Sequence, residues 1–356
     1  MKRILKLLFI SSLCVLLVGC FNKKETPETV ITALDIDFLK LDKAEENYKI
    51  NGVYKLDNTN FAIFVEYLGD NKSDIYKYNL ADNTYSKALE FENKIEYIGV
   101  ENENKTLYVF SNKSEVNSKN NNEIVHIHWP TMKIKEIVIE NYKYANHVMS
   151  KDGTHIAYSS ETGVSVIDTQ TGLTKRVLTH KIKDGDPHFE PVAISDDLVI
   201  YKKIELDSVV GFGTINISGQ DNKYKEAKDG KYLMYDVENA NIYYTEANVS
   251  RNVYKLNLDN EEANQLFITV ARNVQNLKNR QIFLSDDNKT LCTVEYIVEE
   301  NGNNYVIKLI DIESQEITFE YEFASNLGTD INCCVFMEKN IVFAKDNGIY
   351  VVDYTK

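Results

Sequence analysis

The sequence predicts an all-β fold, a single β-propeller of seven four-stranded blades, with six or eight blades as alternatives. The first observation is a succession of short segments rich in Tyr, Phe, Val and Ile, separated by clusters of Asp, Asn and Gly. Examples are NFAIFVEYL at 60–68, GVSVIDT at 163–169 and GIYVVDY at 348–354. The second observation is the lack of helical periodicity after the first twenty residues. The third is a repeat with the length of a propeller blade.

The repeat is a strand that ends in a polar residue, followed by an apolar or small residue and then a turn. Its polar residue recurs seven times, at Asn79, His128, Asp168, Asn216, Asn257, Asp311 and Asp353. The copies span 274 residues in six intervals, which gives about 46 residues per interval. This period suits a blade of four short strands.

Residues 1–19 are predicted to be a cleaved lipoprotein signal peptide. Lys2, Arg3 and Lys6 form a positive region, and residues 7–18 form an apolar run that is too short to span a bilayer. The run ends in LVGC at 17–20, which resembles the lipobox of bacterial lipoproteins. The resemblance implies that Cys20 receives the lipid. An ordinary secretory signal with a chance cysteine at its end is the alternative.

Residues 20–28 are expected to be a flexible tether, because they are polar and include Pro27. Residues 29–356 then form the propeller domain. Its last blade stops after a third strand, IYVVDY at 349–354, and no residues remain for a fourth. The segment TVITALDIDFLKL at 29–41 has strand-like apolar spacing, so we expect it to complete the last blade. This pairing closes the ring and removes an exposed sheet edge.

A second motif recurs within the blades as a tight turn between two strands: SKDG at 150–153, SDD at 195–197 and SDDN at 285–288. SKDGTHIAYSS at 150–160 resembles the blades of TolB-like and WD-repeat-like bacterial β-propellers, which carry Ser-Pro-Asp-Gly before an Ile-Ala-Phe-like strand. No copy here has the Pro, and two lack the Gly. The resemblance covers most of residues 45–356 and implies an architecture, without a particular activity.

Charge narrows the class of partner. The formal net charge is −14 at pH 7, and loss of the three positive charges in residues 1–19 makes it about −17. This balance disfavours nucleic acid and favours cations or basic surfaces as partners.

Only five of the forty basic residues are Arg, and Asn, Ile and Lys are abundant, a bias typical of AT-rich genomes. We therefore expect a lipid-anchored protein on the extracytoplasmic face of the cell membrane of a Gram-positive host.

Cysteine use does not predict a disulfide framework. Cys14 is lost with the signal and Cys20 is lipidated, which leaves Cys292, Cys333 and Cys334. Cys333 and Cys334 are adjacent in a strand-like segment, so their side chains point to opposite faces. We interpret these two as small core residues.

Tyrosine is frequent, with 23 residues in the chain. Tyr243 and Tyr244 are neighbours on a predicted strand, so one ring is expected in the core and the other outside. The outer ring would be available to a binding surface.

No catalytic residue is predicted, because the sequence holds no nucleophile elbow, zinc-protease motif, Walker loop or complete calcium loop. His126 and His128 alternate in EIVHIHWP and share a strand face, a spacing compatible with metal ligation. No third ligand is identifiable. We interpret them as structural strand histidines beside Trp129.

The candidate ligand-binding residues are Asp184, Asp186, His188 and Glu190, which alternate in KDGDPHFEP before the first strand of the fourth blade. In propellers such a loop opens on one mouth of the central channel. The carboxylates and the imidazole suit a basic partner, and Asp184, Asp186 and His188 are the candidates for a divalent cation. A solvated acidic turn is the alternative interpretation. No cofactor is predicted beyond this cation.

Two functions remain open. The first is a non-enzymatic scaffold that binds an extracytoplasmic protein, a peptide or another ligand, which rests on membrane display and on the lack of a catalytic set. The second is an extracytoplasmic metal-assisted hydrolase or lyase with its site at the channel mouth.

Overall fold

The fold is described from a computed structural model of the 356-residue chain. The structure describes residues 31–33 and residues 48–355, the latter with gaps at 69–71, 93, 103–104, 114–120, 132, 140–145, 161, 180–187, 207, 227–229, 246–251, 261–262, 269–276, 300–301, 325–330, 332 and 346–347. All regular elements in these residues are strands. Within the same residues, no helix is long and apolar enough to cross a bilayer.

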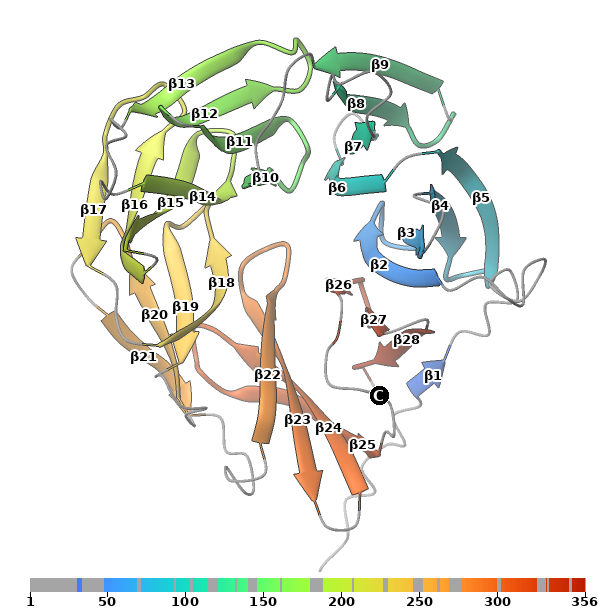
Figure 1. Ribbon diagram of the computed structural model, residues 1–356. Coiled ribbons are helices and arrows are strands. Elements are labelled where there is room, and N and C mark those ends of the chain that lie inside the picture. The colour runs from blue at the N-terminus through green and yellow to red at the C-terminus, as the bar shows by residue number, and fades with distance from the viewer. Residues whose placement is uncertain are drawn as a thin grey trace, which may run out of the picture.

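Seven four-stranded antiparallel sheets stand around a central axis as the blades of a propeller (Figure 1), which confirms the predicted fold and blade number. Blade 1 holds β2 (Tyr48–Lys55), β3 (Asn60–Tyr67), β4 (Lys72–Asn79) and β5 (Thr84–Phe91). Blade 2 holds β6 (Lys94–Glu101), β7 (Thr106–Lys113), β8 (Asn121–His128) and β9 (Lys133–Ile139). Blade 3 holds β10 (His147–Met149), β11 (His155–Ser160), β12 (Gly163–Asp168) and β13 (Thr174–Thr179).

The remaining blades continue around the ring in chain order (Figure 1). Blade 4 holds β14 (His188–Ile194), β15 (Leu198–Glu205), β16 (Ser208–Asn216) and β17 (Lys223–Glu226). Blade 5 holds β18 (Lys231–Asp236), β19 (Asn241–Thr245), β20 (Asn252–Asn257) and β21 (Ala263–Ile268). Blade 6 holds β22 (Leu277–Leu284), β23 (Thr290–Glu299), β24 (Gly302–Asp311) and β25 (Ile317–Ala324). Blade 7 holds β26 (Cys333–Phe336), β27 (Asn340–Lys345), β28 (Gly348–Asp353) and β1 (Ile31–Ala33).

The ring closes as the sequence predicts. β1 pairs with β28 in antiparallel register, with Ile31 opposite Val352 and Ala33 opposite Tyr350. The first strand of the chain therefore serves as the outer strand of the last blade. This pairing gives β28 a partner on both sides, so the two ends of the described chain are joined by backbone hydrogen bonds.

The seven-fold repeat has a hydrogen-bonding cause. In most blades the repeated Asp or Asn accepts backbone N–H groups two or three residues later; Asp168 Oδ1 accepts from Gln170 and Thr171 at 2.8 and 2.9 Å. Such Asx turns carry the chain from the third to the fourth strand. The next residue donates its backbone N–H to the turn between the first two strands of the same blade. This second bond occurs in all seven blades, at Leu80, Trp129, Thr169, Ile217, Leu258, Ile312 and Tyr354.

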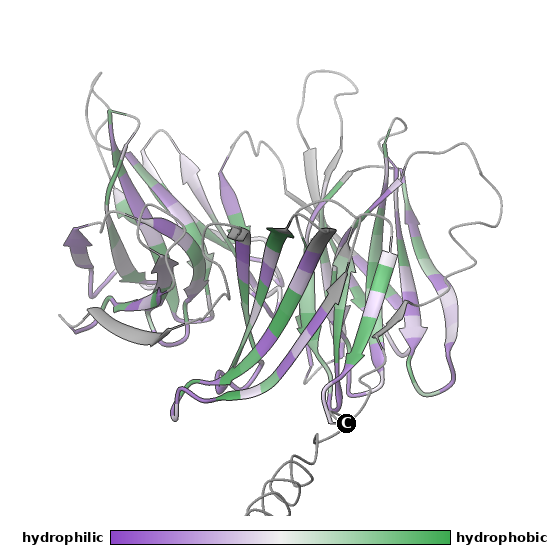
Figure 2. Ribbon diagram, turned by 90° about the horizontal axis from the view of Figure 1, so that it is seen from below, coloured by the Kyte–Doolittle hydropathy of each residue, from purple (hydrophilic) through white to green (hydrophobic). Residues whose placement is uncertain are grey.

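The sheet of a blade is buried on both faces, because it packs against a neighbouring blade on either side. Tyr243 and Tyr244 show this, since both are buried, at 2% and 6% exposure, in two different apolar clusters. The prediction that one ring would lie outside is therefore wrong. The alternation of side chains along a strand decides which of the two neighbouring blades each side chain contacts. Figure 2 shows apolar segments along the strands of the ring.

Strand direction defines two ends of the ring. The first strand of each blade is the innermost (Figure 1), and its last residue leads into the turn to the second strand. We call the end formed by these turns the front mouth, and the end where the first strands begin the back mouth. Ile31 of β1 lies opposite Val352, near the end of β28, so the chain enters the ring from the front side.

Candidate functional site

Two of the turns at the front mouth are fixed by a serine. In blades 3 and 6 the hydroxyl groups of Ser150 and Ser285 accept the backbone N–H five residues later, at 3.0 and 2.9 Å. Between these residues the backbone is left-handed at Gly153 (φ 79°) and at Asn288 (φ 58°), a conformation that Gly and Asn tolerate best. The repeated SKDG and SDDN motifs therefore encode a rigid turn that holds acidic residues at the channel.

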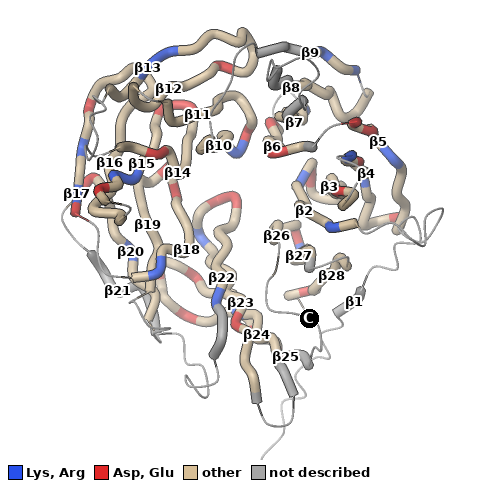
Figure 3. Tube along the Cα trace, in the orientation of Figure 1, with Lys and Arg blue, Asp and Glu red and all other residues tan. Residues whose placement is uncertain are grey.

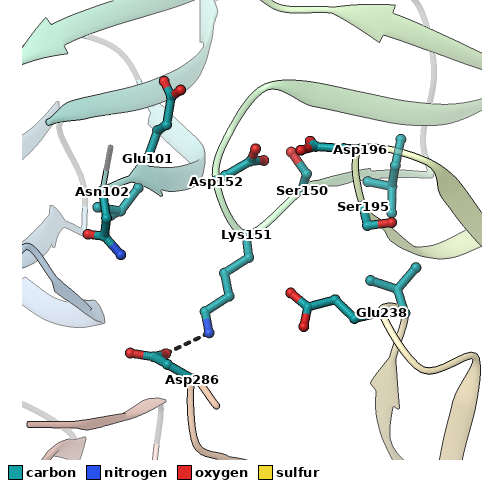
Figure 4. A pocket seen from close by; sticks show the side chains of 12 residues that line it. Glu101, Asn102, Ser150, Lys151, Asp152, Ser195, Asp196, Glu238 and Asp286 are labelled. Carbon is teal, nitrogen blue, oxygen red and sulfur yellow. Dashed lines mark hydrogen bonds and ion pairs between the residues drawn. The ribbon is translucent and has the colours of Figure 1, made fainter. Parts of the chain in front are cut away.

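The turns of blades 2 to 6 surround a cavity of about 430 Å³ at the front mouth (Figure 4). Figure 3 shows acidic segments on the turns around the channel. The charged residues that line the cavity are Glu101, Lys151, Asp152, Asp196, Glu238 and Asp286. Five carboxylates thus face one ammonium group. We call this set the acidic mouth, and its excess of negative charge attracts cations.

Lys151 reaches across the mouth from blade 3 to Asp286 of blade 6 (Figure 4). Its Nζ lies 2.6 Å from Asp286 Oδ1, and Lys55 Nζ of blade 1 lies 3.1 Å from Oδ2. Burial raises the pKa of Asp286, but the hydrogen bonds and charges of Lys151 and Lys55 outweigh burial and hold the pKa below its usual value. The Lys151 side chain is 70% exposed. An ion pair at the surface therefore holds this ammonium group in the mouth, and packing around the side chain contributes little.

Asp152 and Asp196 approach each other where blades 3 and 4 meet (Figure 4). The Thr154 hydroxyl lies 2.8 Å from Asp152 Oδ2 and 2.8 Å from Asp196 Oδ1. Burial raises the pKa of Asp152, but hydrogen bonds from Ser150 and Thr154 outweigh it and leave that pKa lowered. Burial and the neighbouring Asp152 raise the pKa of Asp196. A cation bound here would relieve the repulsion between the two carboxylates.

Glu238 and Glu101 complete the acidic mouth from blades 5 and 2. Glu238 directs its carboxylate into the cavity (Figure 4), and its Oε2 accepts a 2.7 Å hydrogen bond from Asn288 Nδ2 of blade 6. Glu101 Oε2 accepts a hydrogen bond from the Tyr108 hydroxyl at 2.8 Å. Each of the two carboxylates thus accepts a hydrogen bond from this chain.

The carboxylates come from separate turns, and this spacing decides what they can bind. Among the residues that the structure describes, no group of three or more His, Cys, Asp or Glu side chains is placed to hold a metal ion. Ammonium and guanidinium groups need fewer ligands, since each forms charge-assisted hydrogen bonds with one or two carboxylates. The acidic mouth is therefore suited to organic cations that carry more than one positive charge.

Of the candidate ligand-binding residues from the sequence, the structure describes His188 and Glu190. Asp184 and Asp186 are outside the described residues. His188 and Glu190 lie in β14, the inner strand of blade 4, and at its beginning. They therefore stand at the back mouth, at the opposite end of the channel from the acidic mouth. Cys20, the predicted lipidation site, is also outside the described residues.

Glu190 is held by contacts within the protein. Its Oε2 lies 2.7 Å from Lys202 Nζ, and its Oε1 accepts a 2.6 Å hydrogen bond from Asn146 Nδ2. His188 Nε2 lies 3.3 Å from Oε1. A ligand that used this carboxylate would have to compete with Lys202 and Asn146.

His126 and His128 have structural roles in the described part of blade 2. His126 is buried, and its Nε2 lies 2.8 Å from the carbonyl oxygen of Thr169 in blade 3. Burial lowers the pKa of His126. His128 Nδ1 lies 2.6 Å from the Thr131 hydroxyl, where the other blades carry their Asx turn. These contacts agree with the interpretation of both as structural strand histidines.

The turns of the acidic mouth are visible in the sequence, but their combined role is not. SKDG, SDD and SDDN were each assigned to a local turn, although all three carry acids. Their shared position in the repeat is the signal that could have found the site, because equivalent turns of a propeller meet at the same mouth. Glu101 and Glu238 lie outside these motifs and give no such signal.

The lowered pKa of Asp286 predicts a pH dependence of stability. A carboxyl group with a lowered folded pKa stabilises the fold above its unfolded pKa, about 3.8, and loses this effect as the pH falls through the folded value. We expect Asp286→Asn to lower Tm by about 1–3 °C at neutral pH, since exposed ion pairs contribute little. The difference should shrink to zero in strong acid. Thermal melts of both proteins across pH check this, and a difference that grows in acid would contradict it.

Neither a family model nor a curated protein matches the sequence of this chain. Its fold is similar to solved structures. One is an oligogalacturonate lyase in complex with manganese, with 12% identity, a TM-score of 0.59, and coverage of 92% of this chain and 93% of that chain. Another is an oligogalacturonate lyase from Vibrio parahaemolyticus, with 13% identity, a TM-score of 0.61, and coverage of 92% and 94%.

A third similar structure is an uncharacterized protein from Listeria monocytogenes, with 8% identity, a TM-score of 0.52, and coverage of 84% of this chain and 89% of that chain. At these identities the likeness concerns the fold alone. It agrees with the propeller architecture over nearly the whole described chain.

Proposed function

We propose that this chain is a lipid-anchored extracytoplasmic scaffold whose front mouth binds a cationic segment of a protein or peptide. The observation that carries the proposal is the acidic mouth, where five carboxylates and one lysine line a cavity of about 430 Å³. Low-dielectric walls around a cavity of one charge sign strengthen the attraction of the opposite charge. The predicted lipid on Cys20 would keep this surface at the membrane.

Lys151 supports the choice of an ammonium or guanidinium guest. Its own ammonium group lies 2.6 Å from Asp286 in the mouth, although the side chain is 70% exposed. A lysine or arginine of a partner offers the same contact. Exchange of Lys151 for the guest group would leave Asp286 paired.

The direction of β1 supports a partner close to the membrane. The chain enters β1 at Ile31 on the front side, and only residues 20–30 separate Ile31 from the predicted lipid. Eleven extended residues reach at most about 36–40 Å. Ile31, which lies on the same side of the ring as the acidic mouth, would then be within this distance of the bilayer.

Octalysine is a suitable probe for the proposal, with octaglutamate as its matched control. We expect purified full-length protein in non-ionic detergent to bind octalysine in a calorimetric titration, with an affinity that falls as salt is raised. Octaglutamate should give no signal. Equal binding of both peptides, or none of octalysine at low salt, would refute the proposal.

The second candidate function is an extracytoplasmic metal-assisted lyase or hydrolase. The likeness in fold to an oligogalacturonate lyase in complex with manganese favours it. Its candidate metal ligands remain Asp184, Asp186 and His188, of which the structure describes His188 alone.

Metal addition separates the two candidates. A ligand that binds only the folded state raises Tm, so a true metal site near His188 should respond to millimolar Mn²⁺, Ca²⁺ or Zn²⁺. The scaffold account predicts no such rise. A rise in Tm that is lost in His188→Ala would instead support the metal-assisted enzyme.

A further inference from the structure

A second cavity opens beside the acidic mouth, between blades 6 and 7. Its volume is about 420 Å³, and Asp286 lines both this cavity and the acidic mouth. Its walls include the turn between β22 and β23 and the turn between β26 and β27, which both lie at the front end of the ring. We call this cavity the side pocket. A segment of a partner that is bound in the acidic mouth is therefore within reach of the side pocket.

The inner lining of the side pocket is apolar and aromatic. Leu309, Phe336 and Met337 line it and are buried. Phe319 of β25 and Tyr354, which follows β28, also line it and are half-buried. Both rings pack against the apolar cluster of blades 6 and 7 that contains Leu309 and Phe336. The side pocket therefore offers an apolar floor and two aromatic side chains to the carbon atoms of a guest.

The rim of the side pocket is acidic. Its charged residues are Asp286, Asp287, Glu338 and Lys55, and the three acids are exposed. Lys55 Nζ lies 3.1 Å from Asp286 Oδ2, so the single cation is already paired. Burial raises the pKa of Tyr354, and the negative charges of Asp287 and Glu338 raise it further, which agrees with an acidic rim. The charge of the rim is therefore complementary to a cationic side chain.

Aromatic walls under an acidic rim fit an arginine side chain better than a lysine side chain. A guanidinium group is planar and weakly hydrated, stacks on aromatic rings and donates two parallel hydrogen bonds to a carboxylate. An ammonium group is compact and strongly hydrated, so it gains less from apolar and aromatic walls. An uncharged aromatic side chain would use the walls and gain nothing from the carboxylates. Arginine is the side chain that uses both parts of the pocket.

We propose that the side pocket receives one arginine side chain of the bound segment and so selects arginine over lysine at that position. The inference rests on the proposed binding of a cationic segment at the acidic mouth, and it adds a residue preference to that function. The apolar stem of the arginine packs on the floor of the pocket, and its guanidinium group stacks on Phe319. Glu338 and Asp287 at the rim accept its hydrogen bonds.

The test is a set of peptides that differ at one position. The peptides have the sequence Lys-Lys-Gly-Xaa-Gly-Lys-Lys, in which Xaa is Arg, Lys or Phe, and each is titrated calorimetrically into the full-length protein in non-ionic detergent at low salt. The Arg and Lys peptides carry the same charge, so their general attraction to the acidic surface cancels in the comparison. We expect the Arg peptide to bind about fivefold more tightly than the Lys peptide, and more tightly than the Phe peptide.

Two variants assign this preference to the side pocket. Phe319→Leu removes the aromatic face and keeps an apolar side chain, and Glu338→Gln removes an exposed carboxylate. Each should reduce the preference for the Arg peptide to less than about twofold. Phe91→Leu is the matched control, because Phe91 is also half-buried and lies at the end of β5 in blade 1. This control should keep the preference of the wild type.

The outcomes separate the side pocket from the proposed function. Octalysine binding together with equal affinities of the Arg and Lys peptides would overturn the side pocket alone. Tighter binding of the Phe peptide than of the Arg peptide would overturn it as well, as would an unchanged preference in both pocket variants. If octalysine and all three peptides fail to bind, the proposed function fails and the side pocket fails with it. The comparison of peptides on the wild type needs no substitution, so a variant that does not fold leaves the test decisive.

Discussion

Glu295→Gln should lower the free energy of unfolding by about 3–5 kcal/mol, the largest effect that we expect of a single substitution. Glu295 is fully buried in blade 6 between two buried cations. Its Oε1 lies 2.9 Å from Arg280 Nε and 2.8 Å from Arg280 Nη2, and its Oε2 lies 3.0 Å from Lys308 Nζ. Loss of the carboxylate charge leaves two buried cations close together. The substitution lowers stability because the two cations stay desolvated while the attraction of the carboxylate is lost.

Equilibrium denaturation in urea measures this effect, with Glu320→Gln as the control. Glu320 lies in β25 of the same blade and is exposed, so the same chemical change there should alter stability by less than about 0.5 kcal/mol. A loss at Glu295 no larger than the loss at Glu320 would contradict the buried ion cluster.

The double variant Asp196→Asn/Glu238→Gln should weaken octalysine binding tenfold or more. The two carboxylates belong to neighbouring blades, and the side chain of Asp196 is 67% exposed. Each removed charge costs about 1 kcal/mol or more at contact distance, since the mouth is less polar than water. About 1.4 kcal/mol corresponds to a factor of ten in affinity.

The matched control is Glu205→Gln/Glu226→Gln, which removes two carboxylates at the back-mouth end of blade 4. It should change octalysine affinity by less than twofold. Because the pKa of Asp196 is raised, the affinity of the wild type should also fall as the pH drops toward this pKa. An equal loss in the two double variants would point to net charge and not to the mouth.

Much of the fold could be predicted because its repeat has a simple chemical basis. An Asp or Asn that starts an Asx turn is visible in one sequence, and the residue after it must donate to the first turn of its blade. The number of such residue pairs in the sequence therefore equals the number of blades. The closing strand could be predicted as well, because the last blade lacks a strand and residues 29–41 supply one.

The acidic mouth could not be predicted in the same way. Asp152, Asp196 and Glu238 lie about forty residues apart, and only ring closure brings their turns together. Asp184, Asp186, His188 and Glu190 could be singled out because they alternate within one short segment. Of these, Glu190 binds Lys202 and Asn146 in the structure.

The interior faces of the blades were also misjudged from sequence. Alternation distinguishes two faces of a strand and does not say whether both are buried. Tyr244 and Glu295 lie in sheets that are covered on both sides, which only the ring arrangement decides. A lone charge in an apolar strand, such as Glu295 in TVEYIV or Lys308 in VIKLID, is the sequence sign of such a buried cluster.

The most direct test of the acidic mouth is to locate bound octalysine on the protein. Octalysine with a photoreactive diazirine group is bound to the full-length chain and irradiated, and the crosslinked residues are identified by mass spectrometry. We predict crosslinks at the front-mouth turns, at residues 150–153, 195–197, 237–240 and 285–288. Crosslinks concentrated at the back mouth, around His188 and Glu205, or spread evenly over the acidic surface, would contradict the account.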